Sequence, residues 1–309
     1  MRAFDIQEVS GWTALEEETL GTKRKLWLIA PDGRRWLFKY RFQPSTGDDW
    51  SEKIAAEIAD LVGIPHAVVE LATLDGHPGV VVLDFTDHTR AGELVLGNAL
   101  LLEADPSYPQ GGRYRIAQHR VDTVLDVLDQ RCTASPDLRD GPVMSMAGAV
   151  FVGYLLLDVL ISNTDRHHEN WGVLMPSDTA RGATPVLAPS FDHASSLGQI
   201  LTDDERLRRL ETRDSGFGVD SFVRKARSAL YGDVGSEKPL TTWDAFQRAG
   251  RRYDPALARW LERLSAVPAR QLAEAIRAVP AERMSLVAKR FAEAVLMSNR
   301  ARLLDRRVS

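Results

Sequence analysis

The chain has 309 residues, 44% of them hydrophobic, which is enough apolar material for one large two-lobed domain or two modest ones. The formal net charge of −4 gives no overall attraction to nucleic acid or to an anionic membrane, so we expect neither direct nucleic-acid binding nor membrane attachment. A single cysteine, Cys132, excludes an internal disulfide, and the N-terminus lacks the apolar stretch of a signal peptide; both favour a cytoplasmic protein.

The first part of the chain is mainly strand-like. Residues 26–29 and 36–40 flank a turn that contains Gly, and so do residues 68–74 and 80–85, which predicts two β-hairpins. Between the hairpins, residues 49–62 carry apolar side chains at helical spacing and end at a Gly-Ile-Pro sequence. We therefore expect two hairpins joined by one amphipathic helix.

After about residue 87 the pattern becomes helical. Helical spacing recurs over residues 121–128, 146–161, 257–264, 270–278 and 281–297. The chain is therefore predicted to have an α+β fold with two lobes. The smaller, β-rich lobe would span residues 1–90, and the larger helical lobe would span residues 91–309.

The most informative stretch follows the predicted helix 146–161 and has the sequence NTDRHHENWG over residues 163–172. Asp165 precedes Asn170 by five residues, which is the separation between the catalytic Asp and a metal-binding Asn in protein kinases. The preceding helix is apolar nearly all round, so we expect it to be buried and to hold the loop rigidly.

A second carboxylate is expected beside this loop. Residues 171–175 and 185–188 are predicted as two short strands, and their pairing would bring Asp192 back toward the loop. Phosphoryl transfer needs mainly positioning and charge neutralisation, and Mg²⁺ prefers hard oxygen ligands. We therefore predict a phosphoryl-transfer site with Asp165 as the catalytic acid/base and Asn170 and Asp192 as Mg²⁺ ligands.

Two other interpretations of the loop compete with this one. A hydrogen-bonded turn after a buried helix explains the polar residues but does not require Asp192. A transition-metal site built from His167, His168 and Glu169 is disfavoured, because adjacent side chains diverge and no HExxH pattern is present.

Lys39 lies inside a predicted strand, where its ammonium must find a partner or reach solvent. In kinases such a lysine binds the nucleotide phosphates and is oriented by a glutamate from a helix, and the helix over residues 49–62 offers Glu52 and Glu57. We prefer Glu52, although its first-turn position also suits the helix dipole. The alternatives are an edge-strand lysine that reaches solvent and a Glu57 partner.

The segment GTKRKL offers backbone N–H groups at Gly21 and a cation at Lys25, both suited to bind nucleotide phosphates. An ordinary basic turn explains these residues equally well, because neither a GxGxxG nor a Walker motif is present.

Two blocks resemble the HipA-like kinase family, whose fold is related to the phosphoinositide and eukaryotic protein kinases. They are ISNTDRHHENWG over residues 161–172 and PSFDHASSLG over residues 189–198, and the resemblance extends in outline over residues 20–200. It implies an ATP- and Mg²⁺-dependent kinase that binds the nucleotide between the lobes. Asp165, Asn170, Asp192 and Lys39 would have the roles given above. It also implies a structural role for His167.

The same resemblance implies a protein Ser or Thr as phosphate acceptor and, by family analogy alone, an antitoxin-like regulator as partner. A small-molecule or lipid kinase is the alternative, because the Asp-Arg-His sequence also resembles phosphoinositide-kinase loops. A nucleotide-binding regulatory pseudokinase is a third interpretation. The chain starts almost directly at the kinase lobe, so we expect no counterpart of the additional N-terminal subdomain of full-length HipA toxins.

Overall fold

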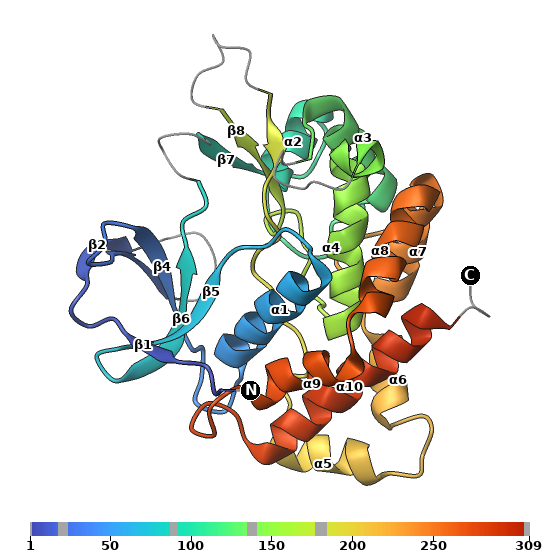
Figure 1. Ribbon diagram of the computed structural model, residues 1–309. Coiled ribbons are helices and arrows are strands. Elements are labelled where there is room, and N and C mark those ends of the chain that lie inside the picture. The colour runs from blue at the N-terminus through green and yellow to red at the C-terminus, as the bar shows by residue number, and fades with distance from the viewer. Residues whose placement is uncertain (1, 18–23, 87–91, 135–140, 177–183, 306–309) are drawn as a thin grey trace.

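A computed structural model describes most of the chain (Figure 1). The described residues are 2–17, 24–86, 92–134, 141–176 and 184–305. Within them, six strands form one sheet in the order β1-β5-β6-β4-β3-β2. These strands are β1 (Ile6–Glu8), β2 (Thr13–Glu17), β3 (Lys25–Ile29), β4 (Arg35–Tyr40), β5 (Val69–Leu74) and β6 (His77–Leu83).

Both predicted hairpins are present, since β3 pairs with β4 and β5 pairs with β6, each antiparallel. β4 also pairs with β6, which joins the hairpins into one sheet. The sequence did not predict the edge strands β1 and β2. All five residues of β2 are exposed, so this strand lacks the alternation of apolar and polar residues on which strand prediction depends.

The two faces of the sheet have different roles. On one face, alternate residues such as Phe38 and Val81 build a small core of their own. On the other face, Val80 and Val82 join the main core together with α1 (Asp48–Val62). Figure 1 shows α1 lying between this sheet and the helical part. Because side chains alternate along a strand, Lys39 lies on the face of β4 opposite Phe38.

The helical part contains the predicted helices and a small second sheet. Its helices are α2 (Gly97–Ala104), α3 (Val121–Arg131), α4 (Ala147–Ile161), α5 (Asp203–Glu211), α6 (Val219–Lys225), α7 (Thr242–Arg252), α8 (Asp254–Ala266), α9 (Ala269–Arg277) and α10 (Leu286–Leu304). The second sheet has the order β7-β8-β9 and consists of β7 (Glu93–Leu96), β8 (Gly172–Met175) and β9 (Val186–Leu187). The α+β architecture expected from the sequence is therefore confirmed.

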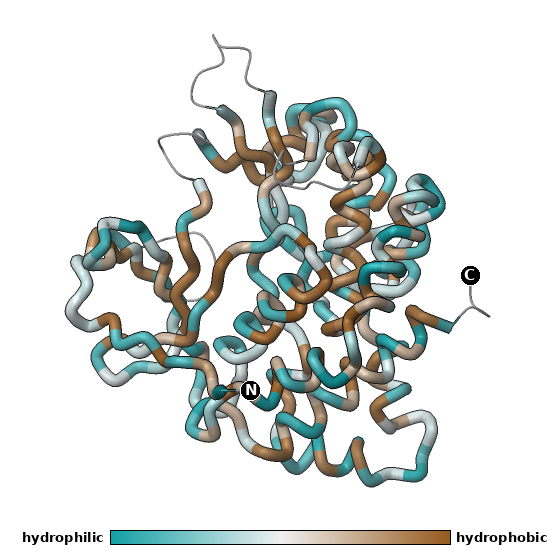
Figure 2. The backbone as a smooth tube through the Cα atoms, in the orientation of Figure 1, coloured by the Kyte–Doolittle hydropathy of each residue, from teal (hydrophilic) through white to brown (hydrophobic). Residues whose placement is uncertain are grey.

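Every residue of α4 is buried, as its apolar sequence predicted, and Figure 2 shows mostly hydrophobic colouring along it. The last helix differs from the prediction, because α10 begins at Leu286 rather than at residue 281. Ser285 is its N-cap, and its hydroxyl accepts a hydrogen bond from the Ala288 N–H at 3.0 Å. Residues 281–284 therefore precede the helix.

Helices α2, α5, α6 and α7 were not predicted. The sequence of α5, DDERLRRLE, has only two apolar residues, Leu207 and Leu210, and its buried residue is Arg206, so its apolar pattern is too short to predict a helix. The predicted lobe boundary at residue 90 falls within residues 87–91, which lie outside the described part of the chain. In the part of the chain that is described, we find no helix that combines the length and apolar character needed to cross a membrane.

Candidate active site

A buried ion pair holds the loop that follows α4. Asp158 near the end of the helix receives two hydrogen bonds from the Arg166 guanidinium, from Nε at 2.9 Å and from Nη2 at 2.7 Å. Asn163 Nδ2 also donates to Asp158 at 2.8 Å, and Arg166 Nη1 donates to the Asn170 carbonyl at 2.9 Å. Both charged side chains are almost completely buried, so this pair fixes the two ends of the loop.

Our sequence interpretation missed the role of this pair. The available signal was a carboxylate within an otherwise apolar helix, because a buried Asp158 requires a cationic or hydrogen-bonding partner. Arg166 lies eight residues further on.

The structure brings the three predicted phosphoryl-transfer residues to one place. Asn170 Nδ2 donates to the Asp165 carbonyl at 2.7 Å, which leaves the side-chain oxygen of Asn170 as its potential metal ligand. The predicted hairpin of β8 and β9 forms, and the chain then returns to Asp192, whose backbone adopts a left-handed conformation with φ of 57°. Asp165 and Asp192 line the same small cavity.

Lys39 joins the two lobes at this point. Its ammonium donates to Glu52 Oε1 at 2.7 Å and to Asp192 Oδ1 at 3.1 Å. Burial acts to lower the pKa of Lys39, but the negative charges of Asp192 and Glu52 outweigh burial and raise this pKa above its usual value. Lys39 is therefore a fixed cation at neutral pH.

The two glutamates left open by the sequence have different partners. Glu52 is buried and contacts Lys39, whereas Glu57 Oε1 accepts a hydrogen bond from Lys53 at 2.6 Å. Glu52 is therefore the acid that meets the strand lysine.

Lys25 lies directly opposite Lys39 in the pairing of β3 with β4, and both lysines line the cavities of the site. Arg113 lines the same cavities and pairs with Glu169, which the sequence did not indicate. Gly21 lies outside the described residues.

The histidines of the loop have structural partners. Glu169 N–H donates to His167 Nδ1 at 3.1 Å, and burial lowers the pKa of His167 to about 4. His168 contacts the Tyr108 hydroxyl at 2.8 Å and the Gly112 carbonyl at 3.2 Å. Among the described residues, no group of three or more His, Cys, Asp or Glu side chains is arranged to hold a metal ion.

Two adjoining cavities form the site. The larger has a volume of about 310 Å³, within the range of small-molecule sites, and lies between the first sheet and the loop. Its apolar walls include Trp27, Leu37, Val82 and Phe191. The smaller, of about 150 Å³, is lined by charged residues of both lobes. An apolar compartment beside a charged one suits a nucleotide base and its phosphates.

The side chains at the site fit Mg²⁺ and ATP, the cofactors that the sequence implied. The Asn170 amide oxygen and the Asp192 carboxylate are hard oxygen ligands, and Mg²⁺ commonly combines one or two such groups with waters and phosphate oxygens. Lys39 and Lys25 supply positive charge beside them.

Comparisons with known proteins give the same architecture. The proinflammatory kinase CtkA of Helicobacter pylori matches with a TM-score of 0.77 and 21% identity over 97% of this chain and 96% of that chain. HipA of Shewanella oneidensis MR-1, solved with HipB and operator DNA, matches with a TM-score of 0.55 and 13% identity over 98% of this chain and 65% of that chain. At these identities the likeness shows the fold, and it confirms the predicted two-lobed, protein-kinase-like fold.

No curated protein matched the sequence. The family model described as the HipA-like C-terminal domain matches residues 18–282, which is most of the chain. The chain therefore belongs to the family of HipA-like C-terminal domains.

Proposed function

We propose that this protein is an ATP- and Mg²⁺-dependent kinase that transfers the γ-phosphate of ATP to a Ser or Thr of a protein. The observation that carries the proposal is the double contact of Lys39 with Glu52 and Asp192, at a cavity that Asp165 also lines. This arrangement joins the nucleotide-binding cation, its orienting acid and a metal-binding acid at one point.

The proposed roles follow from the position of each side chain. Lys39 binds the phosphates and is held by Glu52, while Lys25, which lines the same cavity, adds a second cation. Asn170 and Asp192 would hold Mg²⁺, which when bound neutralises charge on the transferring phosphoryl group. The apolar walls of the larger cavity would receive the base.

Asp165 acts on the acceptor. The acceptor O–H gives its proton to the Asp165 carboxylate while its oxygen bonds to the γ-phosphorus, the bond from that phosphorus to the bridging oxygen breaks, and ADP leaves. Ser195 Oγ donates to Asp165 Oδ2 at 3.3 Å, so a hydroxyl already stands where an acceptor hydroxyl would donate.

We propose residues 1–90 and 91–309 as the two lobes of the enzyme. We also propose a cytoplasmic location, which suits the free thiol of Cys132. HipA of Shewanella oneidensis was solved together with HipB from a toxin–antitoxin system. By analogy we propose an antitoxin-like regulator as a partner of this chain.

The test is transfer of phosphate from γ-labelled ATP with Mg²⁺, offered to protein, lipid and metabolite acceptors. We expect label on protein Ser or Thr, and its loss in Asp165→Asn. Asp60→Asn is the matched control, because Asp60 carries the same side chain at an exposed position of α1.

Other outcomes would favour the other interpretations. Transfer only to a lipid or metabolite would contradict a protein acceptor while leaving the kinase assignment intact. Tight ATP binding without phosphate transfer to any acceptor, including water, would support a regulatory pseudokinase.

A further inference from the structure

A third cavity, of about 300 Å³, lies at the start of α1 and shares no lining residue with the two cavities of the candidate active site. Its walls come from the segment between β4 and α1, from the start of α5, and from the segment that leads into α10. We call it the arginine cavity, because Arg41, Arg206 and Arg283 line it.

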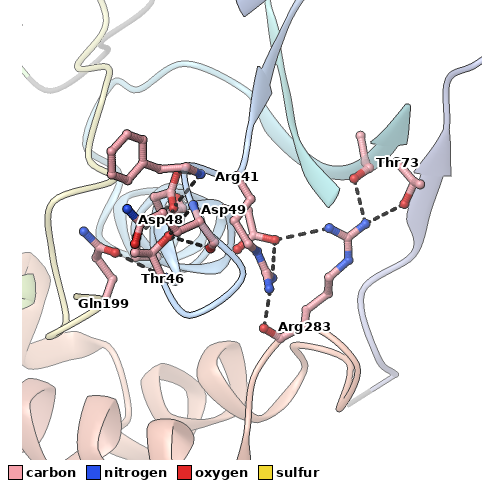
Figure 3. A network of polar contacts seen from close by, with 12 residues as sticks. Arg41, Thr46, Asp48, Asp49, Thr73, Gln199 and Arg283 are labelled. Carbon is pink, nitrogen blue, oxygen red and sulfur yellow. Dashed lines mark hydrogen bonds and ion pairs between the residues drawn. The ribbon is translucent and has the colours of Figure 1, made fainter. Parts of the chain in front are cut away.

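Three arginines and three acidic residues meet at the arginine cavity. Arg41 Nη2 and Arg283 Nη1 both donate to the same oxygen of Asp49, at 2.6 and 3.2 Å, so one carboxylate serves two guanidinium groups (Figure 3). Arg206 pairs with Asp203 at 2.7 Å. A third carboxylate, Asp48, lies beside Asp49 and accepts a hydrogen bond at 2.7 Å from the hydroxyl of Thr46, which also lines the cavity.

Two of these arginines also keep unused donors. The Nε atoms of Arg41 and Arg206 are buried and have no hydrogen-bond partner. Arg206 is only 5% exposed, and a buried donor without an acceptor is unfavourable. Burial lowers the pKa of Arg283, and the charge of Asp49 acts against this shift.

The remaining walls are suited to an oxyanion. Ser285, the N-cap of the long helix α10, lies on the wall, so the positive end of that helix dipole is directed at the cavity. The hydroxyl-bearing residues Ser45 and Thr202 also line it. Guanidinium groups, hydroxyls and helix N-terminal N–H groups are the donors that proteins use for phosphate.

We propose that the arginine cavity binds a phosphate-class anion, either inorganic phosphate or the phosphomonoester group of a small molecule, at a site separate from the candidate active site. The volume exceeds that of one phosphate and leaves room for an attached organic group. Arg41 follows the strand that carries Lys39, and Asp49 lies three residues before Glu52 on α1. An anion bound by Arg41 would therefore lie beside both elements that position the Lys39–Glu52 pair.

The test is calorimetric titration of the full chain with inorganic phosphate and, separately, with O-phosphoserine, at constant pH and ionic strength. Ser45→Glu places a negative charge at the exposed edge of the cavity and is expected to weaken binding at least about tenfold. Ser265→Glu, the same change at an exposed position of α8, should leave binding unchanged. Arg206→Lys keeps the charge but loses the fork of donors, so it should weaken binding as well.

Lys39→Met distinguishes this site from the candidate active site. We expect Lys39→Met to retain the phosphate binding that Ser45→Glu loses. Tighter binding of O-phosphoserine than of phosphate would identify a phosphomonoester ligand, and binding of phosphate alone would identify the free ion. If Ser45→Glu binds phosphate as the unmodified chain does, or if only Lys39→Met loses it, the proposal is wrong. Because Ser45 is exposed, its variant is expected to fold even if Arg206→Lys does not.

Discussion

At the scale of single residues, the contact of Lys39 with Glu52 separates two acids that sequence reasoning could only rank. Glu52→Gln removes a charge-assisted hydrogen bond to a buried lysine, which is worth about 1.5–3 kcal/mol, so we expect turnover with ATP to fall about ten- to hundredfold. Glu57→Gln, on the same helix, removes only a partly exposed contact with Lys53. Steady-state kinetics of both variants would measure the difference.

Equal losses in the two variants would contradict the assigned partner. Thermal unfolding of each variant serves as a control, because Glu52 is buried and its loss also affects stability. A fall in turnover for a Glu52→Gln protein that remains folded at the assay temperature would identify an effect on the site rather than on folding.

The residues that could be predicted from the sequence are those with a distinctive spacing. The interval between Asp165 and Asn170 and the return of the chain to Asp192 both depend on local elements, a helix and a hairpin, that follow from hydrophobic pattern. The contacts of Arg283 join distant parts of the chain, so no local pattern encodes them. The ion pair of Asp158 with Arg166 was missed although its signal, an acid within an apolar helix, is present in the sequence.

At the scale of elements, the Asp158–Arg166 pair connects α4 to the loop that carries the candidate catalytic groups. Asp158→Asn leaves the Arg166 guanidinium buried without a counter-charge, and we expect the free energy of unfolding to fall by about 3–5 kcal/mol. Chemical denaturation would measure this change. Arg270→Gln, which removes the pair of an exposed arginine with Glu274 on α9, is the control and should cost about 1 kcal/mol or less.

The double variant Asp158→Leu with Arg166→Met separates folding from positioning. Apolar replacement of a buried pair is often neutral for stability, but it would also remove the bonds to Asn163 and to the Asn170 carbonyl. A stable double variant with full phosphate transfer would show that the pair does not position the loop.

Prediction was weakest for elements that lack a periodic apolar face. β2 is exposed along its whole length, and α5 is almost entirely charged, so neither presents the periodic apolar face that marks an element in a sequence. α1 and α4 were predicted because each contributes a wide apolar surface to the main core.

At the scale of the whole molecule, buried histidines predict how stability depends on pH. Burial lowers the pKa of His119 to about 3 and of His167 to about 4, and it lowers the pKa of His193 well below its usual value. Each is neutral in the folded protein, with ring nitrogens engaged by neighbours such as Trp171 Nε1, which donates to His119 at 3.1 Å. In the unfolded chain each regains a pKa of about 6.5.

The sign of the effect follows from these shifts. Above about pH 6.5 these histidines are neutral in both the folded and the unfolded state, so their contribution to stability is fully present. Between about pH 6.5 and 4 the unfolded state binds more protons than the folded state, so the free energy of unfolding decreases as the pH is lowered. Each histidine contributes up to about 1.4 kcal/mol per pH unit to the slope. Unfolding by denaturant at several pH values would measure how the free energy of unfolding changes with pH. His119→Gln should reduce this slope by the contribution of one histidine. A slope unchanged in that variant would mean that His119 is already neutral in both states or charged in both.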